Sequence, residues 1–250
     1  MTEIYLSDAT AQWRCYQISD CHFLADPEGY YQGIQPFRHL ERLLATLEPY
    51  PLILTGDLTQ DHSEASYQLL ADLLKNWPSP VFYLPGNHDD PALMAKVFAA
   101  APFHSAKEIW CAGWQLLLLS TKGETPAGSF DNQRRQALTA RLQDQPHRAA
   151  WLFCHHHPKP IGSSIDEHGL VESAEFCQLL DNTSKVKGLA HGHCHYAYHQ
   201  PSETWQIVGC PASSVQFKLA PEWLTEDQGP QACLWQFAVN QQVQWEFVVV

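Results

Sequence analysis

Five short polar clusters in this sequence each follow an apolar run of the kind that forms a strand. The clusters are Asp20-Cys21-His22, Gly56-Asp57, Gly86-Asn87-His88-Asp89, His155-His156-His157 and His191-Gly192-His193-Cys194-His195. The apolar runs before them are residues 15–19, 52–55, 81–84, 151–154 and 186–190. In an open α/β sheet, ligands bind outside the carboxyl ends of the strands. We therefore expect the five clusters to meet at one edge of one sheet.

The side chains in these clusters are suited to holding metal ions. Carboxylate, amide and imidazole groups together favour Mn, Fe or Zn over a soft thiolate site. Taken singly, each cluster has an ordinary explanation, since Gly-Asp is common in turns and a His run can be a surface segment. The Gly-His-Cys-His cluster is more specific, because His193 and His195 would share one face of an extended segment. The ordered occurrence of all five clusters at strand ends favours a two-metal site.

The order and spacing of the clusters resemble the calcineurin-like metallophosphoesterases. That family's pattern is Asp-x-His, Gly-Asp, Gly-Asn-His-(Asp/Glu), a His and then Gly-His-x-His, and all five parts are present over residues 20–195. The flanking segments look like bacterial class III 3′,5′-cyclic-AMP phosphodiesterases; they are residues 17–20, 55–62, 84–89, 110–114, 155–158 and 214–218. The resemblance implies hydrolysis of 3′,5′-cyclic AMP to 5′-AMP by a hydroxide that bridges two metal ions.

The resemblance also implies a role for each residue of the clusters. Asp57 would bridge two divalent or trivalent ions, which are Fe, Mn or Zn. One ion would take Asp20, His22, Asp57 and His195, and the other would take Asp57, Asn87, His155 and His193. His88 would give a proton to the leaving 3′-oxygen, since a His pKa near neutrality suits that role. Catalysis is thus assigned to His88, Asp57 and Asn87, and substrate contact to His22, Asp57, Asn87, His88 and His195.

The run of three histidines leaves the metal ligand open between two of them. The family usually has His-His-Pro-Pro with its first His on the metal, and alignment through Pro160 makes His155 that residue. His157 is the alternative, because it would lie on the same face of an extended segment. We expect His156 to point towards an outer partner and His191 to serve in packing.

Strand-like and helix-like segments alternate along the chain. Apolar residues recur at helical spacing in 35–47, 63–77, 91–101, 131–142 and 173–180. Further strands are expected at 109–112, 116–120, 205–209, 232–239 and 243–249, with a hairpin tip at Asn240-Gln241. Residues 219–230 are the least structured-looking part. The pattern predicts an α/β protein in which a two-sheet β-sandwich is flanked by helices, as a single domain over residues 1–250.

Composition and charge restrict the partners that we expect. The net charge is −12, with 27 acidic and 15 basic residues, which argues against an extended nucleic-acid surface. No apolar run reaches the length of a membrane span, and residues 1–8 do not form a secretory signal. The eight cysteines contain no Cys-x-x-Cys pair, so we expect them to be reduced and the protein to be cytoplasmic. The expected partners are a small cyclic nucleotide and a second copy in a homodimer.

The substrate is less well determined by the sequence than the chemistry. The Gly-Asp-x-x-Asp-Arg-Gly pattern of protein phosphatases lacks its Arg here, where His62 follows Asp61. Candidates to stack on a purine are Phe23, Tyr30, Tyr31 and Phe217, and candidates to meet phosphate or ribose are Lys159, Lys218 and Arg38. Three hypotheses remain: a cyclic-AMP phosphodiesterase, the same chemistry on another diester or monoester such as a glycerophosphodiester or nucleotide, and a scaffold without metals.

Overall fold

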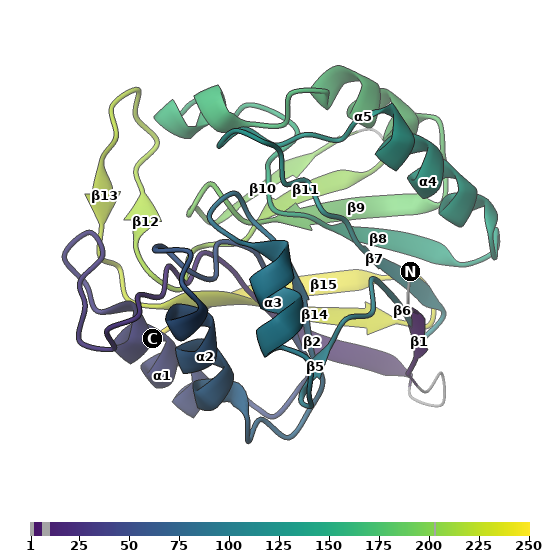
Figure 1. The fold of residues 1–250 in the computed structure, drawn as a ribbon. Coiled ribbons are helices and arrows are strands. Elements are labelled where there is room, and N and C mark those ends of the chain that lie inside the picture. Colours follow the sequence, from purple (N-terminus) through teal and green to yellow (C-terminus); the bar gives the residue numbers. More distant parts are fainter. Residues whose placement is uncertain (1–2, 7–10, 203) are drawn as a thin grey trace.

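The computed structural model of this protein describes residues 3–6, 11–202 and 204–250. Residues 1–2 and 7–8, part of the segment in which we expect no secretory signal, lie outside the described residues. Figure 1 shows two sheets packed face to face between two groups of helices. The expected two-sheet sandwich with outer helices is confirmed.

One sheet has six strands in the order β15-β14-β2-β3-β4-β5. Their bounds in that order are Val243–Val249, Gln231–Ala238, Gln12–Ile18, Leu52–Thr55, Val81–Leu84 and Phe103–His104. Strands β2 to β5 run parallel to one another, whereas β14 pairs antiparallel with both β2 and β15. The turn between β14 and β15 holds Asn240 and Gln241, as expected.

The other sheet has seven strands in the order β1-β6-β7-β8-β9-β11-β10. Their bounds in that order are Glu3–Tyr5, Glu108–Cys111, Trp114–Leu118, Ala149–Phe153, Val186–His191, Gln206–Gly209 and Tyr198–Pro201. Strands β7, β8, β9 and β11 are parallel, so their carboxyl ends lie at the same edge. A separate pair, β12 (Gln216–Phe217) and β13 (Thr225–Glu226), forms a hairpin beside the body of the molecule (Figure 1). The segment 219–230 is therefore not wholly irregular.

Three of the helices begin at residues whose side chains cap them. The helices are α1 (Pro36–Thr46), α2 (Glu64–Leu74), α3 (Pro91–Val97), α4 (Asn132–Gln143), α5 (Ser173–Asp181) and the 3₁₀ helix η1 (Ser164–His168). The side chains of Ser63, Asp90 and Asp131 accept hydrogen bonds from the first-turn amides of α2, α3 and α4, which satisfies donors that have no partner within the helix. Proline occupies the first turn of α1 and α3, where its missing N–H costs nothing.

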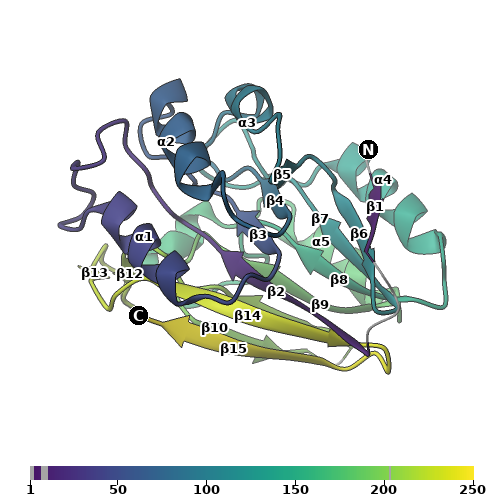
Figure 2. The same ribbon diagram turned by 90° about the horizontal axis from the view of Figure 1, so that it is seen from below.

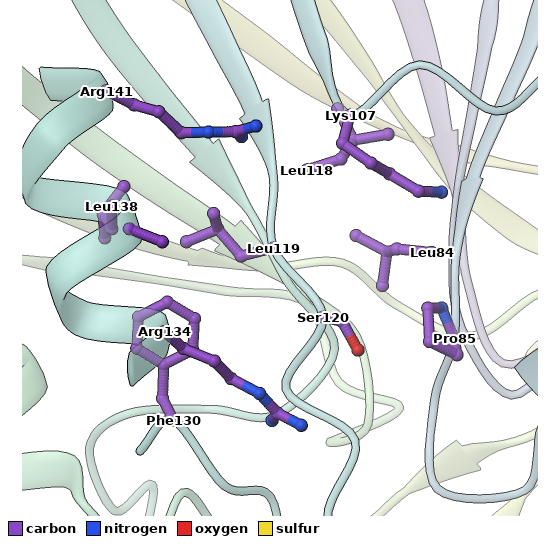
Figure 3. Close-up of a pocket in the computed structure, with 11 residues that line it drawn as sticks. Leu84, Pro85, Lys107, Leu118, Leu119, Ser120, Phe130, Arg134, Leu138 and Arg141 are labelled. Atoms are coloured by element: carbon purple, nitrogen blue, oxygen red, sulfur yellow. The ribbon is translucent and has the colours of Figure 1, made fainter. Parts of the chain in front are cut away.

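Three apolar clusters hold the layers together. Helices α1 to α3 cover the outer face of the six-stranded sheet, with Leu40 and Leu70 packed beside Leu54. Helices α4 and α5 cover the other sheet (Figure 2). Leu138 of α4 and Phe176 of α5 belong to one apolar cluster with residues of that sheet. The two sheets share a central core whose buried Trp and Phe rings are Phe82, Trp114, Trp151, Phe153, Trp235 and Phe237. An apolar cavity remains beside α4 (Figure 3).

This arrangement corrects one expectation about the site. The strands that precede Asp20, Asp57 and Asn87 belong to the six-stranded sheet, whereas those that precede His155 and His193 belong to the seven-stranded sheet. The five clusters therefore come from two facing sheets and not from one. The two halves meet because Trp151 and Phe153 of β8 pack on Trp235 of β14, which brings the carboxyl ends of both parallel sets together.

Candidate metal centre and substrate pocket

All seven residues proposed as metal ligands meet at the carboxyl ends of the two sheets. Three overlapping groups have potential ligand atoms within 4.8 Å of one another: Asp20 with His22 and His195, Asp20 with Asp57 and His155, and His155 with His156 and His193. Apart from Asn87, each of the seven is almost completely buried. The carboxylates and imidazoles of five distant sequence clusters thus form one continuous polar centre inside an otherwise apolar fold.

Asp57 lies between two sets of donor atoms. On one side, its Oδ2 is 3.9 Å from His22 Nε2, and His195 Nε2 is 3.1 Å from His22 Nε2 and 3.4 Å from Asp20 Oδ1. On the other side, Asp57 Oδ2 is 3.4 Å from His155 Nε2, which lies 3.1 Å from Asn87 Oδ1. Nitrogen atoms bound at about 2.0–2.1 Å to one tetrahedral ion are roughly 3.3 Å apart, so this spacing fits donors that share an ion.

Four histidines at the centre use one ring nitrogen to bind a protein acceptor. His22 Nδ1 donates to Gln60 Oε1 at 2.7 Å, and His195 Nδ1 donates to the Val215 carbonyl at 2.7 Å. His155 Nδ1 donates to the Thr55 carbonyl at 2.8 Å. The fourth, His193, donates through Nε2 to the carbonyl of His168 at 3.1 Å. These bonds fix each ring and its tautomer, and they leave the opposite nitrogen free to bind a metal.

The remaining nitrogens face other acceptors. In their neutral forms, His22 Nε2 and His195 Nε2 each present a lone pair to the other, and His155 Nε2 presents one to Asn87 Oδ1. Burial, followed by the nearby His195, lowers the pKa of His22 to about 3, so the cationic form of His22 is disfavoured and the ring is neutral. Burial also opposes charge on His155, but Asp57 raises its pKa to about 9. At neutral pH the metal-free protein therefore keeps a proton on His155, which a metal ion would replace. A cation would also satisfy the facing lone pairs of His22 and His195, so the residues present fit a metal centre.

Most of the proposed ligands have backbone conformations that non-glycine residues rarely adopt. The φ angles are 56° at Asp20, 50° at His22, 49° at Asp57, 66° at His193 and 48° at His195. Such left-handed residues cost of order 1–3 kcal/mol each and persist where the surrounding structure enforces them. Here they turn each side chain off the end of its strand and into the centre.

Close backbone packing enforces these turns. A Cβ on Gly56 would lie 2.5 Å from the amide nitrogen of Gly86 and 2.6 Å from His155 Nδ1, and Gly56 itself has φ of 94°. Only glycine therefore fits between the β3 and β4 loops at this point. The Gly-Asp motif serves this close approach as well as supplying the Asp57 carboxylate.

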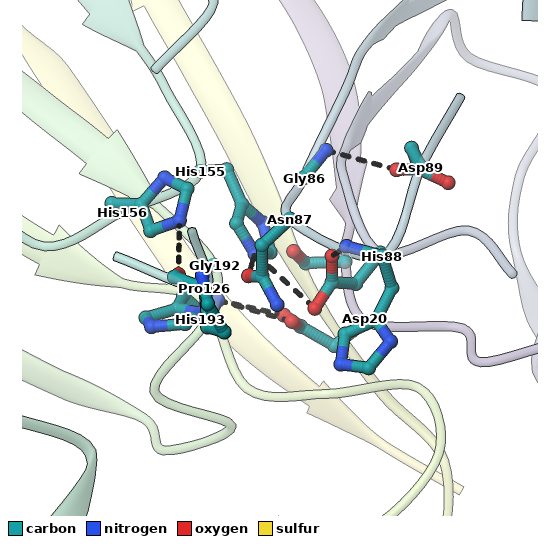
Figure 4. Close-up of polar contacts among 12 residues, drawn as sticks. Asp20, Gly86, Asn87, His88, Asp89, Pro126, His155, His156, Gly192 and His193 are labelled. Atoms are coloured by element: carbon teal, nitrogen blue, oxygen red, sulfur yellow. Dashed lines mark hydrogen bonds and ion pairs between the residues drawn. The ribbon is translucent and has the colours of Figure 1, made fainter. Parts of the chain in front are cut away.

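Asp89 ties the same two loops together. Its carboxylate accepts hydrogen bonds from the amides of Leu58 at 3.1 Å and Gly86 at 2.9 Å and from the Tyr67 hydroxyl at 3.0 Å. Burial and the nearby Asp57 raise the pKa of Asp89 to about 6. Asp89 thus positions Asp57 and Asn87 without belonging to the cluster of proposed ligands (Figure 4).

The three consecutive histidines take three different environments. His155 joins the centre, whereas His157 Nε2 lies 3.2 Å from Asp166 Oδ1 and borders a different pocket. His156 Nε2 donates to the Pro126 carbonyl at 3.1 Å, and its Nδ1 accepts from the Thr121 hydroxyl at 2.8 Å (Figure 4). Both nitrogens of His156 are therefore occupied, although its ring borders the cluster. His191 likewise bonds the Gly192 carbonyl and the Tyr198 hydroxyl, each at 2.6 Å.

A pocket of 240 Å³ opens above the centre. Its lining combines metal-site residues with an aromatic wall, and comprises His22, Tyr31, Asp57, Asn87, His88, Pro126, Ile165, His168, His193, His195, Phe217 and Trp223. The ring of Tyr31 stacks on His22 at 4.4 Å, and that of Phe217 stacks on His195 at 4.0 Å. Neither Lys nor Arg lines this pocket, so the pocket side chains offer no fixed cation to a phosphate.

His88 reaches the pocket from the loop after β4. Its backbone amide donates to Asp57 Oδ1 at 2.8 Å, which holds the residue beside the centre. Its side-chain Nδ1 is buried and has no hydrogen-bond partner among the described residues. Burial, only partly opposed by Asp57, lowers the pKa of His88.

Five of the seven candidates for contact with base, phosphate or ribose do not line the pocket. Phe23 is buried in the core, and Tyr30 is exposed outside the pocket. All three proposed cations lie elsewhere: Arg38 pairs with Glu28 and Glu41, Lys218 pairs with Glu226, and Lys159 lies over the Trp205 ring. Local ion pairs and ring contacts determine where these side chains lie, and closeness to a motif in the sequence does not predict those contacts. Only Tyr31 and Phe217 of the named candidates line the pocket.

Two pocket residues with aromatic rings, Trp223 and His168, escaped the sequence reasoning. Trp223 lies 5.4 Å from Phe217 in an edge-on arrangement and is half exposed, and His168 lies 6.1 Å from Trp223. Neither residue lies in a sequence motif. Their place over the centre depends on how η1 and the β12–β13 hairpin pack in the fold. The exposed Trp in a polar segment was the one available signal.

The chain is similar in sequence to a known family and to known enzymes. The model of the calcineurin-like phosphoesterase family matches residues 14–197. A probable cyclic nucleotide phosphodiesterase from Pseudoalteromonas sp. is 40% identical over 225 residues, which are 88% of this chain and 85% of the relative. The 3′,5′-cyclic adenosine monophosphate phosphodiesterase CpdA of Escherichia coli K12 is 31% identical over 233 residues, which are 86% and 85% of the two chains.

Solved structures share the fold. A dimetal phosphatase from Danio rerio superimposes with a TM-score of 0.64 at 15% identity, covering 95% of this chain and 98% of that one. The protein belongs to the calcineurin-like phosphoesterase family and is an enzyme of that family. Among the residues that the structure describes, no helix is long and apolar enough to span a membrane.

Proposed function

We propose that this enzyme is a dinuclear metal-dependent phosphodiesterase that hydrolyses 3′,5′-cyclic AMP to 5′-AMP. The observation that carries the metal dependence is the buried pair of His22 and His195, whose Nε2 atoms face each other across 3.1 Å while both Nδ1 atoms already donate to protein acceptors. The substrate class is supported by relatives of 30–40% identity whose names specify cyclic nucleotides or cyclic AMP.

The two ions would be held by overlapping ligand sets that share Asp57. One set is Asp20, His22, Asp57 and His195, with both imidazoles binding through Nε2. The other is Asp57, Asn87, His155 and His193, with His155 binding through Nε2 and His193 through Nδ1. The donor types suit Fe, Mn or Zn. Bound ions supply charge neutralisation of the phosphate and lower the pKa of the attacking water.

The protein's own groups would orient the diester and handle one proton. Asn87 Oδ1 faces His155, so its amide nitrogen is available to donate to a phosphate oxygen. The His88 imidazole borders the same pocket and would donate a proton to the ribose 3′-oxygen as its bond to phosphorus breaks. Hydrolysis therefore uses metal ions for the anionic charge, in agreement with the absence of Lys and Arg from the pocket lining.

The aromatic wall would accept the base. Tyr31 and Phe217 each have one ring face covered by a histidine of the centre. Trp223 touches Phe217 edge-on and leaves much of its indole exposed above the pocket. A purine has the size and the π face to stack on such a ring, whereas a glycerol headgroup does not.

A substrate panel tests this proposal. Chelator-stripped protein is reloaded with Mn²⁺, Fe²⁺ or Zn²⁺ and assayed on 3′,5′-cyclic AMP, 3′,5′-cyclic GMP, a glycerophosphodiester and 5′-AMP. We expect cyclic AMP to give the highest kcat/KM and the stripped protein to be inactive. A higher kcat/KM on the glycerophosphodiester or on 5′-AMP would mean that the enzyme uses the same chemistry on another diester or on a monoester. The homodimer and the cytoplasmic location stay predictions from the sequence.

A further inference from the structure

A second cavity lies away from the metal centre, between helix α4 and strands β4 and β7. Its volume is 170 Å³. Its walls are mainly apolar and comprise Leu84, Pro85, Leu118, Leu119, Phe130, Ala137 and Leu138, with Ser120 at one edge (Figure 3). None of the seven proposed metal ligands lines it. The cavity is comparable in size to an apolar cavity of about 150 Å³ that accepts benzene.

Three cationic side chains border this apolar space. Lys107, Arg134 and Arg141 line the cavity, and the lining contains no Asp or Glu. The Lys107 ammonium donates to the Tyr83 carbonyl and lies 4.3 Å from the Tyr83 ring centre. Arg134 donates to the backbone carbonyls of residues 122 and 129. These bonds satisfy donors but do not neutralise charge, because every acceptor is an uncharged carbonyl.

Arg141 is the least satisfied of the three. Its Nη1 is buried and has no hydrogen-bond partner among the described residues. Glu108, a buried carboxylate on the adjacent strand β6, accepts from Gln115 and forms no ion pair with Arg141. Burial lowers the pKa of Lys107 to about 8, which shows that this region disfavours positive charge. A cation in such surroundings is stabilised when an anion pairs with it.

We propose that this cavity binds a small carboxylate with an apolar body, such as an aromatic acid, whose carboxylate pairs with Arg141. A guanidinium presents a planar fork of donors that matches a carboxylate. The leucine and phenylalanine walls accept a ring, and the volume limits that body to about one ring. The proposal does not rest on the proposed phosphodiesterase activity, because the cavity and the metal centre share no proposed ligand.

Binding of three probes to the chelator-stripped, full-length protein tests the chemistry of the site. Benzoate has both the ring and the charge, benzamide has the ring alone, and acetate has the charge alone. Calorimetric titration is expected to give one benzoate per chain. Benzamide should bind at least about tenfold more weakly because it lacks the charge-assisted hydrogen bond, and acetate at least about tenfold more weakly because it has no ring to bury. Equal affinity for benzoate and benzamide, or no saturable benzoate binding, overturns the proposal.

Two matched variants locate the binding. Arg141→Gln should weaken benzoate at least about tenfold, and Arg141→Lys should retain part of the affinity. Arg42→Gln removes the same charge from an exposed position on α1 and should leave affinity unchanged. Thermal unfolding of each variant identifies a folding defect, and Arg141→Lys then provides the comparison if Arg141→Gln does not fold. Benzoate affinity that is insensitive to Arg141→Gln in folded protein would place the ligand elsewhere and refute the assignment.

Discussion

The Nε2 atoms of His22 and His195 lie 3.1 Å apart, although the two residues are 173 positions apart in the sequence. Each ring donates through Nδ1 to its own acceptor, Gln60 Oε1 or the Val215 carbonyl. Two neutral imidazoles in these tautomers would therefore bring two lone pairs together inside the protein. The arrangement is unfavourable for the protein alone and favourable around a cation, so the two histidines fit a metal ion.

Replacement of the carboxylate between the two donor sets should remove both ions. Asp57→Ala is expected to abolish turnover and to lower the metal content at both positions, because Asp57 Oδ2 faces His22 on one side and His155 on the other. Elemental analysis and activity at saturating metal measure the two effects. Asp72→Ala removes an exposed carboxylate from α2 and should change neither. Near-native activity of Asp57→Ala would show that this assignment is wrong.

The His run provides three adjacent variants with different expected metal contents. His155→Ala should lose one ion, because His155 Nε2 lies next to Asp57 and Asn87. His157→Ala should keep both ions, since its Nε2 pairs with Asp166 outside the centre. His156→Ala should also keep both ions with affinity lowered by about 10–100-fold, as an outer partner does. Metal stoichiometry of the three proteins decides between His155 and His157.

The parts of the fold that were predicted from sequence are those with strong local signals. Strands β3 and β4 read as continuous apolar runs, and they are buried on both faces because helices and the second sheet cover them. Helices α2 and α3 have Ser63 and Asp90 at the positions where capping residues are expected. The short strands β5, β12 and β13 carry too few residues for a period to be recognised.

The site residues also divide into those that local sequence predicts and those whose position depends on contacts between distant segments. Asp20, Asp57, Asn87 and His193 follow strands directly, so their convergence could be expected once the strands were recognised. Their separation between two sheets depends on which strands pair, and pairing partners are not encoded in the spacing of one segment. His168 and Trp223 were missed for a related reason, because their place above the centre results from packing between segments distant in sequence.

The exposed indole above the pocket should matter for a substrate that has a base. Trp223→Ala is expected to raise KM for cyclic AMP by roughly 5–100-fold, because base–aromatic stacking contributes about 1–3 kcal/mol per base. Trp223→Phe should keep part of the affinity. Leu224→Ala changes the next residue, which is exposed and does not line the pocket, and should have no effect.

A second substrate separates base recognition from general damage to the centre. An ethyl nitrophenyl phosphate diester has no base, so its steady-state constants should be nearly unchanged in Trp223→Ala. A parallel loss on this diester and on cyclic AMP would mean that Trp223 supports the hairpin or the metals and does not recognise the base.

Buried neutral histidines should make the metal-free protein sensitive to acid. Burial lowers the pKa of His191 to about 3 from an ordinary value of 6.5, while its Nε2 accepts from Tyr198. Because the folded pKa is depressed, the neutral ring contributes stability that is complete above pH 6.5 and is lost as pH falls towards 3. Unfolding free energies measured in denaturant between pH 7 and 4 should therefore decline with acidity.

The variant His191→Gln isolates this contribution. It removes one titrating group, so its unfolding free energy should fall less steeply below pH 6.5, by up to about 1.4 kcal/mol per pH unit. His199→Gln, at an exposed position on β10, should keep the wild-type slope. Identical slopes for wild type and His191→Gln would show that His191 does not gain a proton on unfolding in this range.

The dependence of the His88 contribution on the leaving group tests its role as proton donor. The ribose 3′-oxygen is a poor leaving group without a proton, whereas nitrophenolate leaves unaided. His88→Ala should therefore lose about 10²–10⁴-fold in kcat on cyclic AMP and much less on bis(4-nitrophenyl) phosphate, with metal content unchanged. His62→Ala is a matched control, because its ring lies 5.6 Å from His88 but does not line the pocket. Equal losses on both substrates would instead indicate that His88 places the phosphate or the metals, and the comparison requires chemistry to limit turnover of both.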